Sequence, residues 1–187
     1  MQERQIMFAE RVKGLRPAPW DLIPDLGLYM DQVITYVERQ CSVLYRNGER
    51  VLTPSMVNNY VKIGLVGRPV DKKYGREQLA QLLMICVLKQ ATSAEGMKEL
   101  LRLPEGGMQV LYEDFCCRQQ AAIEELTASL PLPSAIYCAV RSAAYVFLCN
   151  DILGKKPKSD EKEDAGATQV NTGTRERNRG KRTDVHR

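Results

Sequence analysis

Histidine is nearly absent from this sequence: the only one, His186, is next to the last residue. This lack argues against histidine acid–base catalysis, Cys–His nucleophile pairs and histidine-containing metal motifs in a folded site. The chain also lacks the G-x-S-x-G, H-E-x-x-H and glycine-rich phosphate-loop motifs. We therefore predict that the protein has no catalytic residues, is not an enzyme and needs no cofactor.

The sequence has six cysteines but no C-x-x-C pair. Cys116 and Cys117 are adjacent, and adjacent side chains on a helix point about 100° apart. We therefore favour reduced, structural thiols over the alternative of a metal or redox site, and predict no metal.

Long apolar runs are also missing. The N-terminal residues do not form the continuous apolar segment of a signal peptide. The most apolar stretch, Ala135–Cys149, contains Arg141 and is shorter than the roughly 20 residues of a membrane span, so it favours a buried helix. We expect a cytoplasmic protein without membrane contact.

Positive charge is unevenly distributed. Lys and Arg number 27 against 23 Asp and Glu, and the excess lies in residues 154–187. This segment is rich in charge and has no aromatic residue, so we predict a disordered tail. Residues 43–90 form a second basic stretch, with eight basic and three acidic residues.

Apolar residues at helical spacing predict a mainly α fold. The helix at 76–90 is apolar on all sides between 82 and 88, which predicts a central position. Asn47-Gly48 between two apolar arms predicts a β-hairpin. The predicted helices are 25–40, 54–63, 76–90, a short one capped by Thr92 and ending before Pro104, 108–130 and 134–153.

The predicted helix after Thr53 and Pro54 has two distinct faces. Apolar residues occupy one side, and a polar stripe recurs at i, i+3, i+4 and i+7 on the other. Neighbouring asparagines are poor helix formers, but asparagine can contact adenine, and serine and lysine can contact bases or phosphate. We predict base reading by this stripe, with an ordinary solvated face as the alternative. Its members are Ser55, Asn58, Asn59 and Lys62.

The segment 64–75 follows this helix directly and is predicted to form a short hairpin, with Leu65-Val66 pairing near Lys73-Tyr74. A helix followed by a basic hairpin is the arrangement of a winged helix-turn-helix, whose wing binds the DNA backbone. The alternative is a connecting loop whose lysines only aid solubility. The predicted phosphate contacts are Arg68, Lys72, Lys73 and Tyr74.

Three stretches, Leu28–Val33 (LYMDQV), Met56–Lys62 (MVNNYVK) and Lys72–Tyr74 (KKY), resemble a bacterial MerR-like helix-turn-helix family of unknown function. The DNA-binding half is similar to that of MerR-type regulators. The resemblance covers about Pro24–Leu153. It implies a recognition helix at Pro54–Ile63, a wing at Gly64–Tyr74, two supporting helices and homodimerisation through a C-terminal helix.

We therefore expect four segments: an N-terminal extension (1–24), a MerR-like winged helix-turn-helix domain (25–104), a C-terminal helical region for dimerisation (105–153) and the disordered charged tail (154–187). The predicted function is a DNA-binding transcriptional regulator that binds double-stranded DNA as a homodimer, with the recognition helix in the major groove. The alternative is a helical protein-interaction module that keeps the fold without binding DNA.

Overall fold

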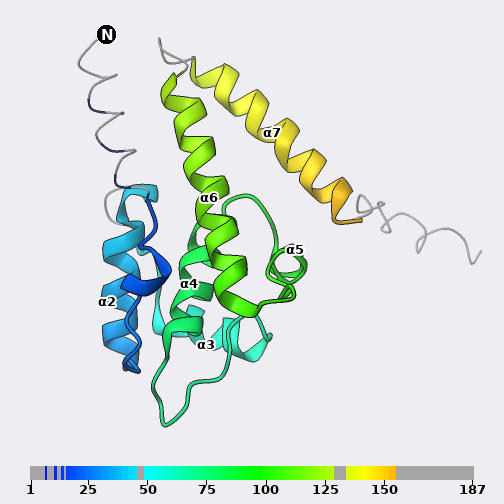
Figure 1. The fold of residues 1–187 in the computed structure, drawn as a ribbon. Coiled ribbons are helices and arrows are strands. Elements are labelled where there is room, and N and C mark those ends of the chain that lie inside the picture. The colour runs from blue at the N-terminus through cyan, green and yellow to red at the C-terminus, as the bar shows by residue number, and fades with distance from the viewer. Residues whose placement is uncertain are drawn as a thin grey trace, which may run out of the picture. The chain divides into compact units, whose positions relative to one another are not determined.

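The computed structural model describes Met7, Arg11, Gly14 and residues 16–45, 49–128 and 134–154. Within these ranges the fold is mainly α-helical, as predicted, and contains no β-strand (Figure 1). The helices belong to one compact unit, Met1–Lys155. They are α2 (Met30–Cys41), α3 (Pro54–Lys62), α4 (Arg76–Leu88), α5 (Ala94–Leu100), α6 (Gly107–Ala128) and α7 (Ala135–Ile152), with 3-10 turns η1 (Trp20–Leu22) and η2 (Ser42–Leu44).

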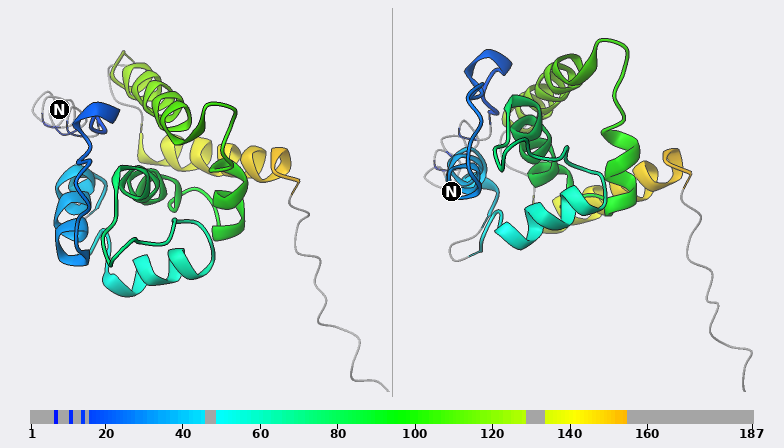
Figure 2. Two further views of the ribbon diagram at one scale, coloured as in Figure 1. Left: turned by 60° about the horizontal axis from the view of Figure 1, so that its bottom comes forward. Right: turned by 90° about the horizontal axis from the view of Figure 1, so that it is seen from below.

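Helix α4 lies at the centre of the core, as its uniformly apolar sequence predicts. It packs against α2 on one side and α6 on the other (Figure 2). Every side chain from Leu82 to Cys86 is at most 2% exposed. Fully buried Val33 and Val37 of α2, Val57 of α3 and Tyr112 of α6 belong to the same core.

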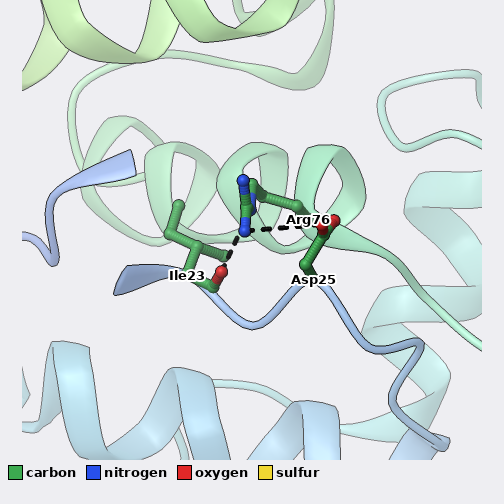
Figure 3. A network of polar contacts seen from close by, with 3 residues as sticks. All are labelled: Ile23, Asp25 and Arg76. Atoms are coloured by element: carbon green, nitrogen blue, oxygen red, sulfur yellow. Dashed lines mark hydrogen bonds and ion pairs between the residues drawn. The ribbon is translucent and has the colours of Figure 1, made fainter. Parts of the chain in front are cut away.

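Arg76, the first residue of α4, holds the connector that precedes α2 (Figure 3). Its Nε donates a hydrogen bond of 3.1 Å to the carbonyl of Ile23, and its guanidinium lies 3.6 Å from the Asp25 carboxylate. The guanidinium carbon also lies 5.8 Å from the centre of the Trp20 ring. The Trp20 ring in turn lies 6.0 Å from that of Tyr112, so the connector is fixed to both α4 and α6.

The first predicted helix begins later than expected. Its predicted start was Asp25, but α2 begins at Met30. Residues just before it are extended, because the backbone of Leu28 exchanges two 2.9 Å hydrogen bonds with that of Tyr74. A helix through Leu28 would lose this pairing.

Two local predictions are also corrected. Ser42–Leu44, which would form the first arm of the predicted hairpin, is a 3-10 turn, and Glu49 and Arg50 are not in a strand. The Asn47-Gly48 turn itself lies outside the described residues. Helix α5 is capped by Ser93, whose Oγ accepts from the Gly96 amide, rather than by Thr92.

The C-terminal region forms α6 and α7, which match the predicted helical pair. The prediction of a buried helix at Ala135–Cys149 is wrong for the single chain, because α7 has no buried residue. Apart from Gly154, the predicted disordered tail lies outside the described residues. In the described ranges, no helix has the combination of length and apolarity that crossing a bilayer requires.

Candidate nucleic-acid interface

Helix α3 has well-defined ends. At its start, the Thr53 side chain accepts a 3.2 Å hydrogen bond from the Met56 amide, and Pro54 occupies the first helical position. At its end, Gly64 has a φ of +77°. The amide of Leu65 donates to the Tyr60 carbonyl and that of Gly64 to the Val61 carbonyl, which is the Schellman arrangement. The helix is therefore short and fixed in length.

The polar stripe predicted on α3 faces solvent. Val57 and Tyr60 are buried on the opposite side and anchor the helix to the core. The structure therefore brings the four predicted base-reading side chains together on one exposed surface. These are Ser55, Asn58, Asn59 and Lys62.

The hairpin predicted after α3 does not form, so the prediction of a wing is wrong. Leu65 and Val66 both donate their amides to the Tyr60 carbonyl, at 2.9 and 3.3 Å. These groups complete the end of α3 and cannot also pair with Lys73-Tyr74. Both side chains are buried, which fixes this conformation.

A tight turn takes the place of the wing. Val70 and Lys73 exchange two backbone hydrogen bonds of 3.0 and 2.8 Å. Between them, Asp71 and Lys72 have φ angles of 50° and 63°, as in a type I′ turn. Aspartate tolerates this left-handed conformation well, but for lysine it is strained. Lys72 is therefore held at the tip of the turn by its surroundings.

Two glutamines of α4 hold this loop against the core. The Gln81 side chain accepts a 2.9 Å hydrogen bond from the Gly67 amide. The Gln78 side chain accepts one of 2.9 Å from the Gly75 amide and donates one of 3.5 Å to the Arg68 carbonyl. Our reading of the sequence missed both anchors. The spacing from Gly75 to Gln78, which matches half of a capping box, could have indicated the Gln78 anchor.

Lys73 is positioned by the segment before α2. A Cβ added to Gly27 would lie 2.8 Å from the Lys73 Cβ, so the glycine leaves room for the base of this side chain. The Lys73 ammonium lies 5.2 Å from the centre of the Tyr29 ring, within range of a cation–π interaction. This contact could not be predicted from the sequence, because it joins residues that are distant along the chain.

The basic side chains of this surface are available for a ligand. Lys62, Arg68, Lys72 and Lys73 are all exposed, and none pairs with a carboxylate in the part of the chain that the structure describes. The nearby Arg76 differs because it is committed to Ile23 and Asp25. Figure 1 shows α3 and this loop at the same end of the molecule.

Tyr74 differs from the other predicted phosphate contacts. Its side chain is 3% exposed, and burial raises the pKa of its hydroxyl. Its backbone joins the loop to Leu28. We therefore leave Tyr74 out of the candidate surface, which consists of the α3 stripe, Arg68, Lys72 and Lys73.

The described residues contain no group of three or more metal-ligating side chains. Cys116 is partly buried, its neighbour Cys117 is exposed, and both are free thiols. Desolvation raises the pKa of Cys116. The two cysteines therefore differ in exposure, as neighbouring residues of a helix do.

Comparison with known proteins gives one match. Residues 18–114 match the family described as "Domain of unknown function (DUF1836)". No curated protein and no solved structure matches the chain. The family description names no MerR-type regulator, so the MerR resemblance stays a prediction. Because the match covers more than half of the chain, the protein belongs to the DUF1836 family.

Proposed function

We propose that this protein is a DNA-binding transcriptional regulator of MerR-like type that binds duplex DNA as a homodimer. The observation that carries this proposal is the candidate surface itself. A helix that exposes Ser, Asn and Lys is followed by a loop with three exposed cations that lack carboxylate partners among the described residues. Both elements are fixed to one core.

In this proposal α3 reads bases in the major groove. The groove of B-DNA admits an α-helix, and the amide of asparagine can bond both N6 and N7 of adenine. Asn58 and Asn59 are exposed at the middle of α3, and Val57 and Tyr60 hold the opposite side. The rigid attachment supports base reading because a fixed helix loses little entropy when it binds.

The loop after α3 supplies phosphate contacts. Arg68, Lys72 and Lys73 would release counterions from the DNA backbone, a term that depends strongly on salt. The anchors from Gln78 and Gln81 and the turn at Asp71-Lys72 hold these charges in place. In this proposal the short basic loop contacts phosphate in place of the wing that the sequence predicted.

Helix α7 supports the homodimer. It has large exposed apolar side chains, with Ile136 72%, Val140 62% and Phe147 75% exposed. These three recur at helical spacing, and such a continuous apolar surface is typical of an interface. A second copy would cover it and place two α3 helices on DNA, as two-fold DNA-binding proteins do.

A titration of fluorescent random duplex at several salt concentrations tests this proposal. The wild-type protein should bind, and log affinity should fall steeply with log salt. The double variant Lys72→Ala/Lys73→Ala should bind all duplexes more weakly and flatten the slope by up to about two. The matched control, Arg102→Ala/Arg118→Ala, removes two charges outside the surface and should leave the slope unchanged. No binding at low salt would contradict the proposal.

The second candidate is a helical protein-interaction module. The exposed apolar side chains of α7 favour it independently of the α3 surface. It predicts that the protein forms complexes through α7 while random and selected duplexes stay unbound. The same titration therefore separates the two functions.

A further inference from the structure

Lys73 lies between the turn after α3 and the connector that precedes α2. Its backbone exchanges two hydrogen bonds with that of Val70 across the turn. On its other side, the backbone of Leu28 pairs with that of Tyr74. This antiparallel pairing places Tyr29 opposite Lys73, and opposite residues direct their side chains to the same side. All three neighbours on this side are exposed, Val70 by 73% and Tyr29 by 53%.

The Lys73 ammonium is held beside the Tyr29 ring. A Cβ added to Gly27 would lie 2.8 Å from the Lys73 Cβ and 3.3 Å from its Cδ, so the lysine stem runs along the Gly27 backbone. The ammonium ends 5.2 Å from the ring centre. Tyr29 is fixed as well, because its amide donates a 3.0 Å hydrogen bond to the Gln32 side chain. Both groups are therefore positioned before a ligand binds.

The ammonium and the phenol hydroxyl are close enough to bind one phosphate group. The hydroxyl lies at the edge of the ring, so its oxygen is within roughly 8 Å of the Lys73 ammonium. Two hydrogen bonds of about 2.8 Å to different oxygens of one phosphate span a similar distance. Lysine and tyrosine side chains both bind DNA phosphates in known complexes.

We propose that Tyr29 and Lys73 together hold one phosphate of the DNA backbone, an inference that rests on the proposed function. Lys73 supplies the positive charge, and the Tyr29 hydroxyl donates a hydrogen bond to a second oxygen of the same phosphate. The DNA interface therefore continues from the loop after α3 to the start of α2. Lys72 differs from Lys73, because no described aromatic ring lies beside its ammonium.

The test compares the binding of a fluorescent random duplex by full-length wild-type protein and Tyr29→Phe. This variant keeps the ring beside Lys73 and loses only the hydroxyl. Affinity should fall about tenfold, as expected for one hydrogen bond to a charged group. The slope of log affinity against log salt should not change, because no cation is lost. The urea midpoint should also stay the same, since Tyr29 is exposed.

The matched control is Thr35→Val. It removes another exposed hydroxyl from α2, one that donates to the Asp31 carbonyl and lies outside the candidate surface. This change should leave the affinity for the duplex unaltered.

A double-mutant cycle shows whether the two groups share one phosphate. In a Lys73→Ala background, Tyr29→Phe should weaken binding by less than about twofold, because groups that bind the same atom group are not additive. In an Arg68→Ala background, the tenfold loss should persist. Equal losses with and without Lys73 would overturn the shared phosphate.

An unchanged affinity of Tyr29→Phe, with wild-type protein that binds the duplex, would overturn this inference alone. Tyr29 would then only support the Lys73 side chain, which Tyr29→Leu would reveal by weakening binding through loss of the ring. Wild-type protein that binds no duplex at low salt would contradict the proposed function, and the phosphate contact with it.

Discussion

Helices α3 and α7 both expose most of their side chains, but they expose opposite chemistry. Helix α3 buries Val57 and Tyr60 and presents Ser, Asn and Lys to solvent. Helix α7 buries nothing and presents Ile136, Val140 and Phe147. The polar face fits a hydrated, charged partner such as DNA, whereas the apolar face fits a second copy of itself. Exposure alone therefore does not define a binding surface, since the chemistry of the exposed side chains selects the partner.

Truncation of Tyr60, on the buried side of α3, is expected to lower the stability of the protein more than any other change considered below. Tyr60 is 8% exposed, and Tyr60→Ala should destabilise the fold by about 3–5 kcal/mol, as other core aromatic truncations do. Urea denaturation monitored by circular dichroism measures this change. Asn58→Ala on the exposed half is the control and should change stability by less than about 0.5 kcal/mol. The reverse order would mean that the two faces of α3 are assigned wrongly.

A charge on α7 should separate the two copies. Phe147→Glu places a carboxylate at a side chain that is 75% exposed in the single chain. Two such charges would be buried in the dimer, so its dissociation constant should rise by about 100-fold or more. Light scattering should change from twice the mass of one chain to the mass of one. Leu103→Glu, at another exposed leucine outside α7, should leave the dimer intact. A wild-type protein that is monomeric at tens of micromolar would contradict the interface.

A smaller effect comes from the strained turn next to α3. Lys72 has a φ of 63°, so Lys72→Gly should stabilise the fold by about 0.5–1 kcal/mol through relief of strain. Lys73→Gly removes the same charge where φ is not positive and also loses the contact with Tyr29, so it should destabilise the fold. Both variants should reduce the salt dependence of DNA binding by about one. Equal stabilities would show that the turn is not strained at Lys72.

Removal of the negative charge of Asp71, the acidic residue of the turn, is expected to change DNA affinity only slightly. Asp71→Asn keeps a residue type that tolerates the left-handed φ of 50°. It removes a negative charge beside the phosphate contacts, so DNA affinity should rise about two- to fivefold at low salt and converge with wild type at high salt. Glu113→Gln on α6 should have no such effect. An unchanged affinity would place the turn away from the DNA.

Local features of α3 could be predicted from sequence because they depend on neighbouring residues. Thr53, Pro54 and Gly64 mark its ends, and the periodicity of Val57 and Tyr60 identifies its buried side. The central position of α4 followed from its uniform apolarity. These features use only hydrogen bonds and packing preferences within one helix.

Long-range contacts could not be predicted in this way. The pairing of Leu28 with Tyr74 delays the start of α2, and neither segment has the alternation of a strand. The turn at Asp71-Lys72 lacks the glycine that normally marks a type I′ turn. The fold compensates for this strain with contacts from Gln78 and Gln81, which a sequence pattern does not reveal.

Apolar periodicity also did not reveal what covers a helix. The segments that become α4 and α7 both have long apolar stretches, yet α4 is buried and α7 is exposed. The difference depends on which other elements reach each helix in space. The prediction that the region of α7 serves dimerisation therefore remains a prediction about a second chain.

The most direct test compares wild-type protein with Asn58→Ala on two DNA ligands: a duplex selected from a random pool for tight binding and an unselected duplex. If α3 reads bases, Asn58→Ala should cost about 1–3 kcal/mol on the selected duplex and much less on the unselected one. Lys72→Ala/Lys73→Ala should weaken both alike. Equal losses on both duplexes for Asn58→Ala would contradict base reading by α3, and failure to select any sequence would contradict a sequence-specific regulator.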